Sequence, residues 1–134
     1  MNPDAKVYLL MATNANGIKL NQSKWFDILQ TYQNIRFRYF NIYDYSKGTI
    51  IEDFIKKGDW EKSEYALEHV SDFMRLLTVY KYGGLYLDID IIMTEPLKYI
   101  KNNFVCAERP NDLGNSIFYM DTKDGRKYTE KCLM

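Results

Sequence analysis

Two aspartates one residue apart, Asp88 and Asp90, follow an apolar segment and are the residues best placed to do chemistry. If residues 85–92 form a strand, side chains alternate between its faces, and both carboxylates point to the same side, about 7 Å apart at Cα. Tyr86 shares that face, and the opposite face carries only aliphatic residues: Leu85, Leu87, Ile89 and Ile91. Carboxylates are costly to bury unless they are paired or bind a cation. The pattern therefore predicts a site for a hard divalent ion such as Mg²⁺ or Mn²⁺.

The segment before this strand supplies a second acid and a guanidinium. Its apolar residues recur at helical spacing and predict a helix: Val70, Phe73, Leu76, Leu77 and Tyr80. Ser71 suits the N-cap, which would place Asp72 in the first turn, where the helix dipole favours an anion. Arg75 lies three residues after Asp72 on the same helix surface. Gly83 and Gly84 are expected to end the helix and turn the chain into the strand. Together these groups suit a phosphate-bearing ligand with a bridging divalent ion.

The spacing of these residues resembles that of a known enzyme family. Ser71-Asp72-x-x-Arg75, followed by YGGLYLDID at residues 82–90, resembles the DXD sugar-nucleotide site of glycosyltransferases. The pattern is most similar to that of the α-1,4-galactosyltransferase-like (lactosylceramide 4-α-galactosyltransferase-like) enzymes. The resemblance runs from about Lys6 to Ile100 and is strongest over residues 70–98.

The resemblance implies a retaining glycosyltransferase that takes galactose, N-acetylgalactosamine or N-acetylglucosamine from a UDP-sugar. The acceptor would be a glycolipid or glycan, and Mn²⁺ (with Mg²⁺ as the alternative) would bridge the diphosphate. By the same resemblance Asp90 would coordinate the metal, and Asp88 would contact ribose or sugar hydroxyls and reach the metal through water. Asp72 and Arg75 would hydrogen-bond the donor sugar, and Tyr86 would line the same pocket.

The order of strand and helix patterns indicates an α/β domain. The resemblance implies the N-terminal, nucleotide-binding part of a GT-A (Rossmann-like) fold. Ligands in such sheets gather at the carboxyl ends of strands, so Ala12 and Thr13, at the end of strand 6–13, are the expected place for uracil. Asn115 matches, more loosely, an asparagine that follows the DXD region in relatives and could contact sugar or phosphate. Gly114-Asn115 is equally compatible with a plain turn.

Simple patterns predict the remaining elements. They are a helix from Asn21 or Ser23 with Trp25, Ile28, Leu29 and Tyr32 on one face; a strand at 35–41; a capping box Thr49–Glu52 opening a helix to about Lys56; a break at Gly58; helix again from Glu61; a turn or short helix at 97–102; and short strands at Val105 and at 117–120. The segment from Asp121 to Lys131 is polar and shows no clear pattern.

Composition and length narrow the class of protein. The 134 residues balance 18 basic with 18 acidic side chains, which gives no footprint for nucleic acid or an anionic membrane. With 46% hydrophobic residues the chain is expected to fold as one domain, residues 1–134. Compared with members of the family that it resembles, the chain would be a partial domain that lacks the C-terminal acceptor region.

Compartment signals are sparse. No apolar run is long enough to span a bilayer and no signal peptide opens the chain, whereas the family carries a Golgi membrane anchor ahead of the catalytic domain. We therefore expect truncation at both ends and, from the resemblance, a Golgi-lumen location. The glycosylation pattern at Asn21 agrees with a secretory route. Cys106 and Cys132 could pair there, or both could be free.

Other interpretations remain open at this stage. The chain could be a catalytically incomplete fragment that only binds a UDP-sugar or a partner. A Mg²⁺-dependent phosphatase also places Asp-x-Asp after an apolar strand, but it expects Thr where Ile92 stands. Asp72 with Arg75 could be an ordinary helix ion pair, and Tyr86 could be a core residue.

Overall fold

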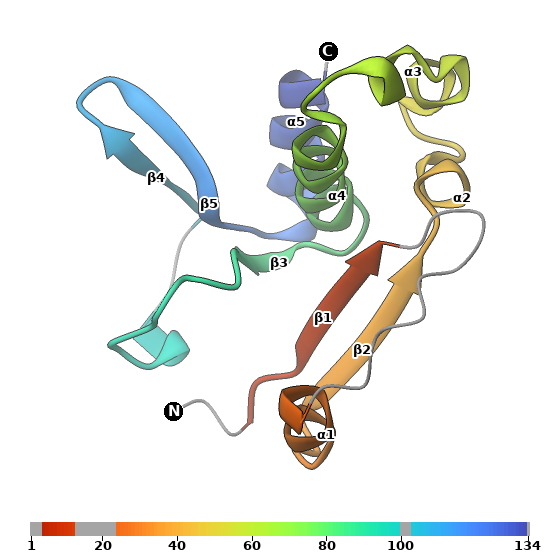
Figure 1. The fold of residues 1–134 in the computed structure, drawn as a ribbon. Coiled ribbons are helices and arrows are strands. Elements are labelled where there is room, and N and C mark those ends of the chain that lie inside the picture. The colour runs from red at the N-terminus through yellow and green to blue at the C-terminus, as the bar shows by residue number, and fades with distance from the viewer. Residues whose placement is uncertain (1–3, 13–23, 100–102, 134) are drawn as a thin grey trace.

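The computed structural model describes residues 4–12, 24–99 and 103–133, and Figure 1 shows their arrangement. In chain order the elements are β1 (Val7–Ala12), α1 (Lys24–Gln30), β2 (Ile35–Phe40), α2 (Ile42–Ser46), α3 (Glu52–Lys57), the 3-10 helix η1 (Asp59–Lys62), α4 (Ala66–Tyr82), β3 (Gly84–Leu87), the 3-10 helix η2 (Leu97–Tyr99), β4 (Phe104–Arg109), β5 (Asp112–Met120) and α5 (Thr122–Leu133). The α/β class predicted from the sequence is confirmed. None of the described helices is long and apolar enough to cross a membrane.

β1 and β2 form a parallel pair, joined through α1, with Val7 opposite Ile35 and Ala12 opposite Phe40. Both strands were predicted within a residue at each end. The apolar face predicted for α1 is not buried, since Trp25 is 72% exposed. The helix instead contacts the sheet through Phe26, whose ring centroid lies 4.5 Å from that of Phe37.

The main core lies where this parallel pair meets the helices. It consists of buried side chains from α2, α3, η1, α4 and the turn before α3: Ile42, Ile51, Ile55, Trp60, Met74 and Leu77. Leu10 of β1 and Phe40 of β2 pack against it from the sheet. The core therefore fixes α4 against the strands that were expected to bind the nucleotide base.

The capping box predicted at Thr49–Glu52 does not form. α3 begins at Glu52 itself, and the Glu52 carboxylate reaches back past Thr49 to accept from the Gly48 N–H at 2.7 Å. The Thr49 hydroxyl is already committed, donating to the Ser46 carbonyl at 2.6 Å. Gly58 ends α3 with φ +73°, as predicted.

α4 is the longest helix, and it begins earlier than predicted. Its first residue is Ala66, so Ser71 is an internal residue and the N-cap role assigned to it is wrong. Asp72 consequently lies beyond the first turn, outside the reach of the helix dipole. The helix ends at Gly83, as predicted, with φ +65°. A Cβ at Gly83 would lie 2.9 Å from the Thr122 nitrogen, so the close approach to α5 requires glycine.

The second sheet is antiparallel, with strand order β3-β5-β4 and Tyr86 opposite Phe118. The strands expected at Val105 and at 117–120 are present, inside β4 and β5. β3 is much shorter than the predicted strand and stops at Leu87. In the described residues it pairs with β5 and not with the β1–β2 pair.

α5 was missed by the sequence analysis and packs along α4. Its polar sequence is compatible with this because two buried small residues, Gly125 and Thr129, accompany the hydrophobic contacts of Tyr128 and Leu133. A Cβ at Gly125 would lie 3.0 Å from the Met120 Cβ, and Thr129 is fully buried with its hydroxyl donating to the Gly125 carbonyl at 2.6 Å. Asp121 caps the helix, accepting from the N–H groups of Lys123 and Asp124.

Both cysteines are free thiols. Cys106 lies in β4 and is half-buried, and Cys132 lies in α5 and is exposed. Cys106 and Cys132 therefore do not form a disulfide in this structure.

Candidate functional site

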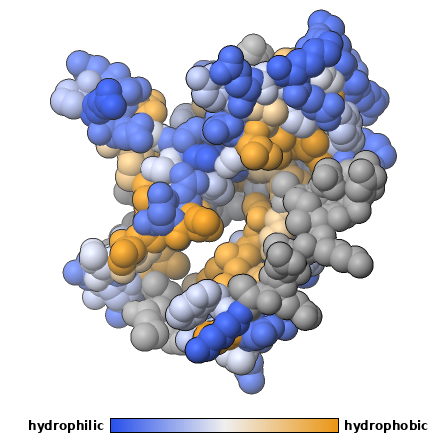
Figure 2. Space-filling view, viewed as in Figure 1, coloured by the Kyte–Doolittle hydropathy of each residue, from blue (hydrophilic) through white to orange (hydrophobic). Residues whose placement is uncertain are grey.

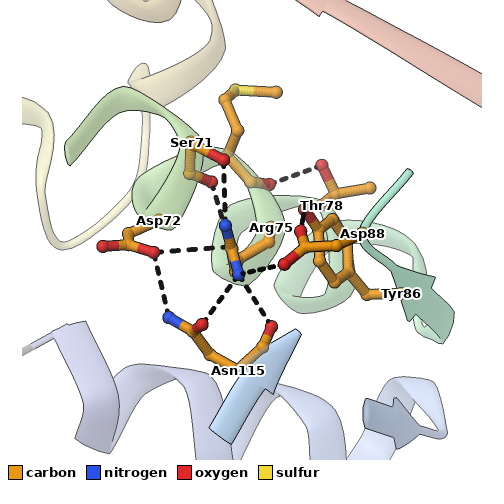
Figure 3. A network of polar contacts seen from close by, with 8 residues as sticks. Ser71, Asp72, Arg75, Thr78, Tyr86, Asp88 and Asn115 are labelled. Carbon is orange, nitrogen blue, oxygen red and sulfur yellow. Dashed lines mark hydrogen bonds and ion pairs between the residues drawn. The ribbon is translucent and has the colours of Figure 1, made fainter. Parts of the chain in front are cut away.

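Arg75 is the centre of a polar network that joins α4, β5 and the end of β3 (Figure 3). Its side chain is only 8% exposed. Nη2 donates to the Ser71 hydroxyl at 2.9 Å, and Nη1 faces Asp88 Oδ2 at 3.3 Å. Cζ of the guanidinium lies over the Tyr86 ring, 5.0 Å from its centroid. A buried arginine with this many acceptors is a fixed structural cation.

Asn115 of β5 lies between Arg75 and Asp72. Its Oδ1 accepts from Arg75 Nη1 at 2.7 Å, and its Nδ2 donates to Asp72 Oδ1 at 2.9 Å. The direct ion pair between Arg75 Nε and Asp72 Oδ1 is longer, at 3.4 Å. Asp72 remains 45% exposed at the side chain. The amide therefore holds an accessible carboxylate beside a buried cation.

Tyr86 connects the strand to the first aspartate of the motif. Its hydroxyl donates to Asp88 Oδ1 at 2.6 Å. Burial, followed by this hydrogen bond to Asp88, raises the pKa of Tyr86 to about 12. The phenol is therefore a neutral hydrogen-bond donor throughout the physiological pH range. Its ring packs against that of buried Phe118, 5.5 Å between centroids.

The two motif aspartates do not share one face of a strand, which corrects the sequence prediction. The Asp88 N–H still pairs with the Ser116 carbonyl at 2.8 Å, but the chain then turns, and the Ile91 N–H donates to the Asp88 carbonyl at 3.1 Å. Ile89, expected to be buried, is 98% exposed, and Ile92 is 87% exposed. Figure 2 shows hydrophobic residues at the surface of this segment, between β3 and η2. The Asp88 carboxylate still contacts Arg75 and Tyr86.

Asp90 differs from the other acids of the site. It lies in the turn, is exposed, and makes no hydrogen bond or ion pair with any part of the chain that the structure describes. Asp88 uses one oxygen for Arg75 and the other for Tyr86, and each oxygen keeps a lone pair.

This donor set fits a Mg²⁺- or Mn²⁺-type ion shared with a ligand. The described residues hold no group of three or more His, Cys, Asp or Glu suited to an all-protein metal site. Ions of this type commonly take one or two carboxylates, with waters and substrate phosphates completing the octahedron. Asp88 and Asp90, two residues apart in the chain, supply that number of carboxylates.

Five of the predicted site residues thus lie together: Asp72, Arg75, Tyr86, Asp88 and Asn115. Ala12 ends β1, and Thr13 lies outside the described residues. Ser71, which was predicted as a cap, is a direct partner of Arg75. The signal for that contact was its position four residues before Arg75, because such residues are neighbours on one helix face.

Comparison with known proteins agrees with this geometry. The family model described as the glycosyltransferase sugar-binding region containing the DXD motif matches residues 1–109. The chain belongs to this glycosyltransferase family. The mixed α/β architecture of the chain is consistent with the GT-A-like fold expected for this family. The match also favours glycosyl transfer over the phosphatase interpretation.

Several curated relatives of this DXD glycosyltransferase domain carry informative names. Human lactosylceramide 4-alpha-galactosyltransferase is 27% identical over 104 residues, 75% of this chain and 29% of that protein. Human alpha-1,4-N-acetylglucosaminyltransferase is 40% identical over 48 residues, 36% of this chain and 14% of that protein. An uncharacterised Arabidopsis thaliana protein is 43% identical over 44 residues, 33% of this chain and 7% of that protein. The chain spans less than a third of the length of each, and no solved structure matches it significantly.

Proposed function

We propose that this chain forms the donor-binding part of a retaining glycosyltransferase. The donor is a UDP-sugar carrying a hexose or N-acetylhexosamine, the acceptor a glycolipid or glycan, and the cofactor Mn²⁺, with Mg²⁺ as the alternative. Family membership and the galactosyl- and N-acetylglucosaminyltransferase names of two relatives support this class of donor. The proposed compartment is the Golgi lumen, as the resemblance implies.

The observation that carries the proposal is the charge arrangement of the site. Arg75 is the only cation among the residues drawn in Figure 3, and it is buried and already paired with Asp88 and Asn115. The accessible charges are the carboxylates of Asp72 and Asp90. A diphosphate would be repelled by such a surface unless a divalent cation lay between them. The site therefore suits a ligand that arrives with a metal ion.

The chain's own residues divide the work as follows. Asp90 holds the metal together with Asp88, and Asp88 also contacts ribose or sugar hydroxyls. When bound, the ion supplies positive charge that stabilises the leaving diphosphate. Asp72 accepts hydrogen bonds from hydroxyls of the donor sugar through its free oxygen. Arg75 holds Asp72 in place through their ion pair.

Four further residues complete the proposed donor pocket. Asn115, exposed at the edge of the network, contacts the sugar or a phosphate. Ala12 and Thr13, at the carboxyl end of β1, contact uracil, as ligands of α/β sheets generally bind at that end of the strands. Tyr86 lines the same pocket.

Calorimetric titration tests the proposal. UDP, UDP-galactose, UDP-N-acetylgalactosamine and UDP-N-acetylglucosamine are titrated into the folded chain with and without Mn²⁺, beside Asp90→Asn. We expect saturable binding that requires Mn²⁺ and is lost in Asp90→Asn, while circular dichroism shows both chains folded. Equal affinity without metal, or in the variant, would contradict the proposed site.

A transfer assay then separates catalysis from donor binding alone. The chain is incubated with the preferred UDP-sugar, Mn²⁺ and a galactose-terminated glycolipid or oligosaccharide. Product with retained anomeric configuration supports a transferase. Donor binding without product supports the second interpretation, a domain that binds the sugar nucleotide only.

A further inference from the structure

Ser71 and Tyr86 hold Arg75 and Asp88 from two sides, a role separate from the pocket lining proposed above for Tyr86. On one side Ser71, one helical turn before Arg75 in α4, accepts from Nη2 at 2.9 Å, and its carbonyl oxygen lies 3.5 Å from Nε. On the other side Tyr86 presents its ring face to the guanidinium and its hydroxyl to Asp88 Oδ1. Figure 3 shows both residues meeting at the Arg75–Asp88 pair.

The hydrogen-bond geometry shows why this arrangement fixes a unique orientation. A guanidinium is planar, and hydrogen bonds to two of its nitrogens together with an aromatic ring packed against it restrict its rotation. Ser71 and Asn115 accept the hydrogen bonds, from Nη2 and Nη1 respectively, and the Tyr86 ring lies against Cζ. Tyr86 also fixes Asp88, because its hydroxyl determines which carboxylate oxygen faces Arg75.

We propose that Ser71 and Tyr86 are positioning residues of the donor site, Ser71 acting through Arg75 and Tyr86 acting through Asp88. Neither needs to touch the sugar nucleotide to affect its binding. The consequence for the ligand rests on the proposed function. The positioning itself is a property of the unliganded chain.

The unliganded chain provides the first test. In ¹⁵N relaxation measurements, Arg75 Nε should be as rigid as the α4 backbone in the parent chain. It should become mobile in Ser71→Ala and in Tyr86→Phe, which keeps the ring but lacks the hydroxyl. Matched controls are Ser63→Ala, whose hydroxyl contacts His69, and Tyr43→Phe, whose hydroxyl donates to the Glu61 carboxylate away from the site. Arg75 Nε that stays rigid in both site variants would overturn the proposal.

Double-mutant cycles on UDP-galactose binding with Mn²⁺ provide the second test. We expect Ser71→Ala and Tyr86→Phe each to weaken binding roughly tenfold, the scale of one hydrogen bond to a charged group. Ser71→Ala should change affinity less than about twofold when Arg75→Lys is already present, and Tyr86→Phe likewise with Asp88→Asn, because each pair acts as a unit. Ser71→Thr, which keeps the hydroxyl, should restore most of the affinity.

The outcomes separate the two proposals. If Ser71→Ala or Tyr86→Phe costs as much in the second background as in the parent chain, that residue contacts the ligand directly and the inference is wrong. If the parent chain binds no UDP-sugar with Mn²⁺, the proposed function fails, and the relaxation measurements alone decide the inference.

Discussion

Nη1 of Arg75 reaches Asn115 twice, at 2.9 Å to its main-chain carbonyl and at 2.7 Å to its side-chain Oδ1. The double contact joins the middle of α4 to β5 and determines the orientation of the amide. With Oδ1 toward the arginine, Nδ2 must point at Asp72. The side chain at position 115 therefore determines whether Asp72 faces a neutral donor or a charged group.

Replacing Asn115 with Asp should damage the donor site more than replacing it with Ala. A carboxylate would still pair with Arg75, but it would place a second negative charge within hydrogen-bond distance of Asp72 Oδ1. Two carboxylates sharing a site resist joint ionisation. We expect affinity for UDP-sugar with Mn²⁺ to fall at least tenfold in Asn115→Asp and less in Asn115→Ala, measured by calorimetry at pH 7. An Asp variant that binds as tightly as the parent would show that the amide donor is dispensable.

Gly83→Ala should destabilise the chain more than Gly48→Ala. Both glycines have positive φ, +65° and +71°, so both substitutions strain the backbone by about 1 kcal/mol or more, and Gly83 also has ψ −170°, a region essentially restricted to glycine. Only at Gly83 would the new Cβ also meet backbone, 2.9 Å from the Thr122 nitrogen, whereas nothing lies within 4 Å at Gly48. Urea unfolding should show an extra loss of roughly 1–3 kcal/mol for Gly83→Ala. Equal losses would mean that α5 can move away without cost.

Alkaline pH should lower the free energy of unfolding through ionisation of Tyr86. Burial and the hydrogen bond to Asp88 raise its pKa to about 12 in the folded chain, from 10.0. Because the folded pKa is higher, the contribution is complete below pH 10 and is lost as pH rises toward 12. The side chain is partly exposed, so we expect about 1–2 kcal/mol after allowing for solvent screening. Denaturant unfolding between pH 9 and 12 should show this extra loss in the parent chain relative to Tyr86→Phe.

Ile89 and Ile92 should tolerate polar substitution. They are 98% and 87% exposed, so Ile89→Gln and Ile92→Gln should each change unfolding free energy by less than about 0.5 kcal/mol. Ile55, with no exposed surface, is the matched control, and Ile55→Ala should cost about 2–5 kcal/mol. A large loss at Ile89 would favour the long strand that the sequence predicted over the turn that the structure shows.

Local patterns in the sequence were sufficient where one segment determines its own structure. The spacing of Asp72 and Arg75, the helix stop at Gly83 and the strands flanking Phe26 all follow from neighbouring residues. The sequence also grouped Asp88 with Asp72 and Arg75 in one candidate site, and in the structure Arg75 Nη1 lies 3.3 Å from Asp88 Oδ2.

The errors arise where a distant segment decides. Leu87 is the last residue of β3, and the alternation within residues 85–92 does not encode where pairing with β5 ends. α5 was missed because its sequence is mostly polar, and two of its buried positions are the small residues Gly125 and Thr129, beside only Tyr128 and Leu133 as hydrophobic contacts. The exact position of Asn115 depended on strand pairing that composition does not specify.

The contact between Asp72 and Asn115 spans 43 residues of sequence, and this separation determines when the network can form during synthesis. During synthesis from the N-terminus, the DXD motif leaves the ribosome well before β5 does. Until β5 pairs with β3, Arg75 lacks both of its Asn115 acceptors and Asp72 lacks its amide donor. A nascent chain halted just after the motif would therefore carry every residue of the DXD signature while still lacking the ordered network around Arg75.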